Sequence, residues 1–83
     1  MIQKQLLKYT VIYTAEPEGG FTVTVPSLPG CVTYGQDLKE AEKMAKEAIS
    51  LYLESLKAHK EPISTGEKSF IGSVDLDFPL ANA

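Results

Sequence analysis

The 83-residue sequence carries a net charge of −3, with 43% hydrophobic and 23% charged residues. This length supports one hydrophobic core and excludes two, and the composition excludes a disordered chain. No apolar run approaches the ~20 residues of a membrane span, the N-terminus lacks a signal-peptide core, and no basic stripe marks a nucleic-acid surface. We therefore expect a single cytoplasmic domain over residues 1–83, with no membrane association and no direct binding to nucleic acid.

The N-terminal half of the sequence predicts three short strands. Residues 6–15 alternate apolar and polar side chains, and residues 21–25 repeat this alternation after a loop with glycine and proline, as in an antiparallel hairpin. Pro26 ends the second strand because it has no N–H for a ladder. Pro29-Gly30 suits a type II turn, in which the glycine accepts a positive φ. A third strand is predicted at residues 32–34.

A long amphipathic helix is predicted from Asp37 to about His59. Asp37 and Glu40 have the spacing of a capping box, and Pro62 disfavours helical geometry at Glu61. The face opposite the apolar stripe is highly charged and is interpreted as solvated. The stripe recurs at helical spacing and comprises Leu38, Ala41, Ala45, Ala48, Ile49, Tyr52 and Leu56.

A fourth strand is predicted near the C-terminus, ending at Pro79. A right-handed crossover through the helix would make it parallel to the third strand and, because the strands alternate, to the first. The simplest placement is beside the first strand, which gives the sheet order 3-2-1-4. The predicted fold is α+β, a two-layer β-β-β-α-β arrangement with one helix packed on one face. The opposite face would be polar, and the free edges predict a homo-oligomer, a dimer or tetramer, built through an edge or the open face. The apolar positions of the fourth strand are Phe70, Gly72, Val74, Leu76 and Phe78.

The sequence offers no recognised catalytic motif, phosphate-binding loop or His/Cys metal spacing. We therefore predict a protein that is not an enzyme and has no cofactor or metal. Cys31 is interpreted as a buried apolar residue and His59 as a cation at the helix C-terminus. Asp75 and Asp77 share a strand face, as a hard cation would require, but the first strand adds no carboxylate there. A weak metal-dependent nuclease is therefore the third hypothesis.

Several motifs together resemble the HicB antitoxin family. The resemblance implies a partial ribonuclease H-like fold. It also implies an antitoxin of a type II toxin–antitoxin system, which binds and neutralises a small basic HicA-type mRNA interferase. It does not imply nuclease activity, because the acidic residue expected in the middle of the first strand of an active ribonuclease H is missing. The motifs are a tyrosine-containing first strand, Glu18-Gly19-Gly20-Phe21, Val25-Pro26-Ser27-Leu28-Pro29-Gly30-Cys31, Gly35, Leu38-Lys39-Glu40-Ala41, Ala45, Glu47-Ala48-Ile49 and Tyr52-Leu53.

The same resemblance directs attention to a partner surface. Ser27, Leu28, Pro29 and Tyr34 are the candidate contact residues, although the turn is favoured as a structural feature. Many such antitoxins append a DNA-binding helix-turn-helix or ribbon-helix-helix, and none is expected between the predicted fourth strand and Ala83. The alternative hypothesis is a stand-alone oligomeric scaffold or small-ligand-binding protein that has the same fold and no toxin partner.

Overall fold

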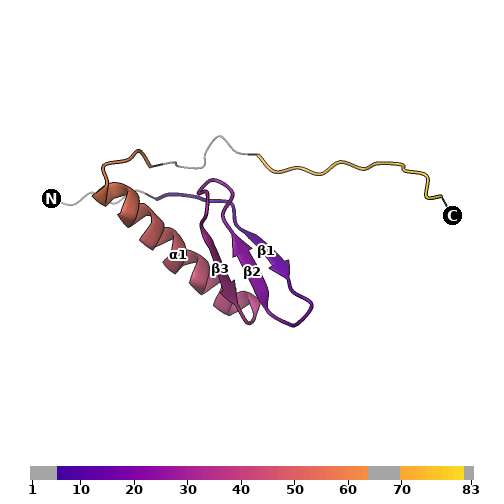
Figure 1. Ribbon diagram of the computed structural model, residues 1–83, viewed down its shortest axis with the longest axis horizontal. Coiled ribbons are helices and arrows are strands. Elements are labelled where there is room, and N and C mark those ends of the chain that lie inside the picture. The colour runs from indigo at the N-terminus through magenta and orange to yellow at the C-terminus, as the bar shows by residue number, and fades with distance from the viewer. Residues whose placement is uncertain (1–5, 64–69, 82–83) are drawn as a thin grey trace.

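The computed structural model describes residues 6–63 and 70–81. Three strands, β1 (Ile12–Ala15), β2 (Phe21–Thr24) and β3 (Val32–Gly35), form an antiparallel sheet in the order β1-β2-β3. A single long helix among the described residues, α1 (Leu38–Ala58), crosses one face of this sheet (Figure 1). The predicted α+β class, with three N-terminal strands and a helix on one face, is confirmed.

The core lies between β2 and α1. Val23 is the centre of the sheet, paired with Tyr13 on one side and Thr33 on the other, and its side chain is fully buried. It packs with Ala41 and Ala45 of the helix. Small helix residues let the two layers approach closely, and at Gly35 an added Cβ would lie 2.4 Å from backbone atoms of Ala41. Strand alternation and the alanine positions of the helix therefore fix the core together.

The proline-rich corner between β2 and β3 forms a second core cluster. Cys31 N donates to Leu28 O over 2.9 Å, and Gly30 has a φ of 81°, so the predicted type II turn at Pro29-Gly30 is confirmed. Val25, Leu28 and Cys31 are buried together against the helix. The hydroxyl of Tyr52 on α1 donates to Pro29 O over 2.8 Å and ties the corner to the helix.

Both ends of α1 have defined caps. At the N-terminus, Glu40 N donates to Asp37 Oδ1 over 2.7 Å, as predicted. The return bond of the capping box differs from the prediction, because Glu40 Oε1 accepts from Gln36 N instead of from the Asp37 N–H. At the C-terminus, Lys60 N donates to Lys57 O and Glu61 N to Leu56 O. With Lys60 at a φ of 57°, this is a Schellman motif, which ends the helix before Pro62 acts.

Two strand predictions were wrong in the same part of the molecule. The first strand was expected over residues 6–15, but β1 begins at Ile12. The fourth strand was expected to end at Pro79 and to lie beside the first, but residues 70–81 contain no strand. A ladder needs a partner, and opposite residues 6–11 the second strand has already turned into the corner. The described sheet therefore has three strands in place of the predicted order 3-2-1-4. The partial ribonuclease H-like fold stays a prediction.

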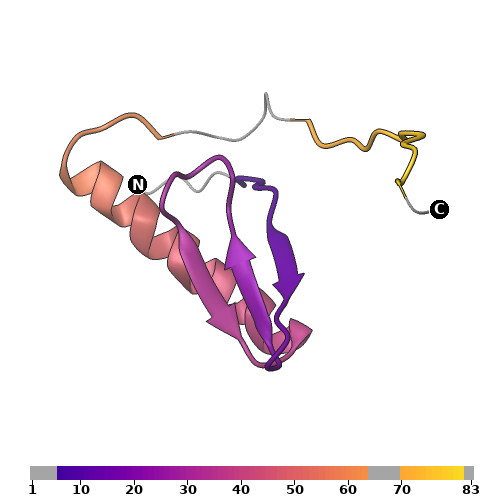
Figure 2. The ribbon, with the colours of Figure 1, turned by 45° about the vertical axis from the view of Figure 1, so that its right-hand side comes forward.

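The C-terminal segment, residues 70–81, lies outside the two-layer domain. In Figures 1 and 2 it runs away from the sheet beyond the β1 side, and the molecule reaches 64 Å along its longest axis. Its side chains are exposed throughout. The exposed large apolar residues there are Phe70, Ile71, Val74, Leu76, Phe78 and Leu80.

Candidate interaction surfaces

The corner residues predicted to contact a partner are mainly engaged in the fold. Leu28 is only 1% exposed, so its side chain belongs to the core. Pro29 is exposed, but its carbonyl accepts the Tyr52 hydroxyl. Ser27 is half-buried, and its Oγ is buried without a hydrogen-bond partner among the described residues. Of these three residues only Pro29 is exposed, and the contact role of the corner stays a prediction.

Tyr34, the fourth predicted contact residue, lies on β3 and folds across the β1–β2 hairpin. Its hydroxyl donates to Gly19 O over 2.9 Å. Gly20 lies directly beneath the ring, since an added Cβ would overlap the phenol. Tyr34 thus fixes the hairpin with its hydroxyl, while about half of its surface remains accessible to another molecule.

The sheet face opposite the helix is uncovered by any other described element. Its two cross-strand rows follow from the register, Ile12-Thr24-Val32 and Thr14-Thr22-Tyr34. We call this surface the open face. Threonines make it polar, as expected, but Ile12, Val32 and Tyr34 add exposed apolar area. The contribution of β3 was not foreseen, although alternation from the buried Cys31 puts Val32 and Tyr34 on this face.

A groove of about 700 Å³ runs between the N-terminal chain and the helix, along the outer edge of β1. We call it the β1 groove. Its floor is mainly apolar, and charged groups of both signs stand at its rim. It is the place where the sequence predicted a fourth strand, which explains why this part of the core is uncovered. It is lined by Leu7, Lys8, Tyr9, Val11 and Tyr13 on one side and by Glu42, Ala45, Lys46, Ile49, Ser50 and Leu53 of α1 on the other.

Two side chains among the described residues, Cys31 and Tyr9, have pKa values that burial raises. Burial raises the pKa of the Cys31 thiol, which favours the protonated, unreactive form. Burial also raises the pKa of Tyr9 beside the β1 groove. Cys31 therefore has the buried position that was predicted for it.

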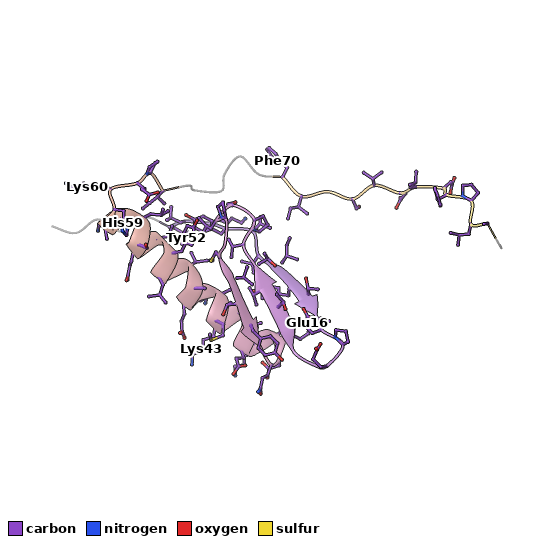
Figure 3. All side chains as sticks on the ribbon, in the orientation of Figure 1. Glu16, Lys43, Tyr52, His59, Lys60 and Phe70 are labelled. Carbon is purple, nitrogen blue, oxygen red and sulfur yellow. The ribbon has the colours of Figure 1, made fainter. Side chains whose placement is uncertain are left out.

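Asp75 and Asp77, considered as a metal site, and His59, considered for catalysis, lie in different parts of the molecule. Asp75 and Asp77 are exposed in the C-terminal segment, and no cluster of three or more metal-binding side chains occurs within residues 6–63 and 70–81. His59 caps the helix C-terminus, with Nδ1 2.8 Å from Ser55 O. Figure 3 places its side chain at the end of α1 that lies near Lys60 and Tyr52, far from the hairpin. No helix among the described residues is long and apolar enough to cross a bilayer.

Comparison with known proteins gives one family match, over residues 9–75. The matching family is described as the HicB_like antitoxin of bacterial toxin–antitoxin systems. A UPF0150 protein of Thermoplasma acidophilum is 54% identical over 57 residues, which cover 69% of this chain and 83% of that protein. A UPF0150 protein of Archaeoglobus fulgidus is 41% identical over 66 residues, covering 80% and 87% of the two chains. A relative from Synechocystis is 42% identical over 60 residues, covering 72% and 76%.

Proposed function

Because the chain belongs to the HicB_like antitoxin family, we propose that it is the antitoxin of a type II pair and acts in the cytoplasm. It would bind a small, basic mRNA interferase of the HicA type and block the surface with which that toxin holds RNA. The observation that carries the proposal is the family match, which runs from Tyr9, just before β1, to Asp75 in the C-terminal segment. The function is binding, and it requires no catalytic group on this chain.

The charge of the chain supports a basic partner. Eleven acidic residues against eight basic ones leave a net charge of −3. Opposite net charges speed the encounter of two proteins, mainly through the association rate. An RNA-binding toxin must carry positive charge to hold phosphates. An acidic antitoxin therefore competes with RNA for the same basic surface.

We place the toxin contact on the open face. Interfaces favour exposed aromatic and aliphatic side chains set in a polar surround. Val32 and Tyr34 supply such groups on β3, and the threonine rows supply hydroxyls around them. Neither side chain is needed to fill the core between β2 and α1. Tyr34 therefore keeps its predicted contact role, with Val32 added beside it.

Co-expression tests the proposal directly. The tagged full chain is expressed with the product of each adjacent reading frame, and growth and co-purification are measured. We expect a small basic neighbour that arrests growth alone, is neutralised by this chain, and co-purifies with it. Recovery of the chain without any toxic neighbour would contradict the antitoxin function. It would favour the alternative, an oligomeric scaffold or ligand-binding protein.

A matched pair of variants tests the surface. Val32→Asp puts a charge on the open face, and Leu51→Asp makes the same change at an exposed aliphatic residue of the helix; the two side chains are 56% and 67% exposed. Val32→Asp is expected to weaken toxin binding at least tenfold and to abolish rescue, while Leu51→Asp is neutral. Equal toxin binding by both variants would show that the toxin contact does not lie on the open face.

A further inference from the structure

Glu16 brings a carboxylate to the edge of the open face. Ile12 and Thr14 of β1 lie on this face, and Glu16 is the next residue of the same parity. Its Oε2 accepts a hydrogen bond from Thr22 Oγ1, in the cross-strand row that ends at Tyr34. The two rows of the open face contain no charged residue. The hydrogen bond therefore holds a negative charge against an otherwise uncharged surface.

The exposed ring of Tyr34 is separated from that carboxylate by one side chain. Tyr34 is the direct cross-strand partner of Thr22, and Cβ atoms of such a pair are about 5 Å apart. The ring reaches from β3 to the hairpin, where its hydroxyl donates to Gly19 O. Gly19 N donates in turn to Glu16 O over 3.0 Å. A closed set of contacts therefore fixes the ring and the carboxylate relative to each other.

The carboxylate of Glu16 has room for a cation. A carboxylate has about four lone-pair positions, and the Thr22 hydroxyl uses one of them. Within residues 6–63 and 70–81, no lysine or histidine forms an ion pair with Glu16. The residue is half-buried and lies at the hairpin end of β1 (Figure 3). It therefore presents a cation of another molecule with an acceptor of fixed direction.

We propose that Glu16 and Tyr34 together hold an arginine side chain of the toxin. This inference rests on the proposed antitoxin function and names the group that the open face recognises. A guanidinium is planar, so it stacks on the tyrosine ring while its N–H groups donate to the carboxylate. A lysine ammonium lacks both the flat surface and the parallel donors. The chain itself contains no arginine, so the group comes from a different protein and not from a second copy.

This contact also provides a way to neutralise the toxin. Arginine binds phosphate through the same two-point geometry with which it binds a carboxylate, and an RNA-binding toxin needs cations on its RNA surface. A guanidinium paired with Glu16 is no longer free to bind a phosphate. Because the ring and the carboxylate are already fixed in the free chain, little ordering opposes the contact.

The first test compares two glutamates of the same hairpin loop. Toxin affinity is measured by titration calorimetry with the full chain and the neighbour found by co-expression. Glu16→Gln should weaken binding about tenfold or more, because it removes a charged hydrogen-bond acceptor. Glu18→Gln removes the same charge from an exposed side chain and should change affinity less than about twofold. Equal effects would overturn the arginine contact and leave the antitoxin function standing, whereas a wild-type chain that binds no toxin would overturn both.

The second test separates the ring of Tyr34 from its hydroxyl. Tyr34→Phe keeps the ring and should keep toxin affinity within about twofold, although it loses the hydrogen bond to Gly19. Tyr34→Leu keeps an apolar side chain without the ring and should weaken binding about threefold to tenfold. Urea unfolding of both variants confirms that they are folded. Equal affinities of the two variants would show that no cation stacks on the ring.

The third test identifies the arginine on the toxin. Each arginine of the toxin is replaced by lysine in turn, and each variant is titrated with wild-type chain and with Glu16→Gln. One replacement should weaken binding to the wild type about as much as Glu16→Gln does, and should have little further effect on Glu16→Gln, because the two residues form one contact. Strictly additive effects for every arginine would overturn the proposal.

Discussion

Strand β2 and the C-terminal segment carry the same kind of pattern and have opposite fates. In β2, Val23 alternates with threonines and is fully buried. In the segment, Val74 lies between Ser73 and Asp75 and is 90% exposed. The difference lies in their neighbours, because β2 has a strand on each side and a helix above it, whereas no described strand or helix covers the segment. Alternation defines which side of a strand can be buried, and the available partner decides whether it is buried.

The largest expected effect comes from replacing a glycine by alanine at Gly35 in the sheet, compared with the same change at Gly72 in the C-terminal segment. Gly35→Ala should destabilise the fold by about 3 kcal/mol, the upper end for overpacking, because the new Cβ would press on the backbone of Ala41. Helix and sheet would have to separate to relieve the contact. Gly72→Ala is the control, since nothing lies within 4 Å of its added Cβ. Urea unfolding followed by helical circular dichroism measures both, and equal midpoints would show that the layers are not closely packed at Gly35.

The next comparison makes the same substitution, valine to alanine, in β2 and in the C-terminal segment. Val23→Ala removes two buried carbon atoms and leaves a cavity, at a cost of about 2 kcal/mol. Val74→Ala should change the unfolding free energy by less than about 0.5 kcal/mol where the chain is monomeric, as at exposed sites in general. Urea unfolding followed by helical circular dichroism measures both variants. Equal costs for Val23→Ala and Val74→Ala would show that the C-terminal segment is packed as tightly as β2.

Features that arise from neighbours in sequence were predicted well. Asp37 caps the helix, and Pro29-Gly30 forms its turn, because each depends on residues within one turn of chain. The short β1 and the missing fourth strand depend instead on a strand partner for residues 6–11, and the alternation at residues 70–78 does not say whether that segment pairs with them. The open face was predicted as polar from the first, second and fourth predicted strands. Val32 and Tyr34 became visible as its apolar part once the register of β3 was known.

The corner gives a smaller and purely conformational effect. Gly30 has a φ of 81°, and no atom lies within 4 Å of an added Cβ, so a substitution there acts through the backbone alone. Gly30→Val should cost about 1–2 kcal/mol, because a β-branched residue resists positive φ. Gly30→Asn should cost less, since asparagine tolerates this region better. Thermal unfolding of the two variants measures the difference, and an unchanged melting temperature for Gly30→Val would mean that the turn is not type II.

The smallest effect concerns Lys60, where the chain leaves the domain towards the C-terminal segment. Lys60 is the one non-glycine residue with positive φ in the part of the chain that the structure describes, and its side chain is exposed. Lys60→Gly relieves that strain without removing the hydrogen bonds of the Schellman motif, so it should stabilise the fold by about 0.5–1 kcal/mol. The larger entropy of glycine in the unfolded chain limits the gain.

Lys57→Gly is the matched control for this change. Lys57 is also exposed but lies in the last turn of α1, where glycine should cost about 0.5–1 kcal/mol. The two substitutions remove the same charge near the negative end of the helix dipole, so their difference isolates the backbone term. Opposite shifts in the urea midpoint are expected. Destabilisation by both would mean that the charge of Lys60 outweighs its strain, and that electrostatics at the C-terminus, not the left-handed residue, controls where the helix ends.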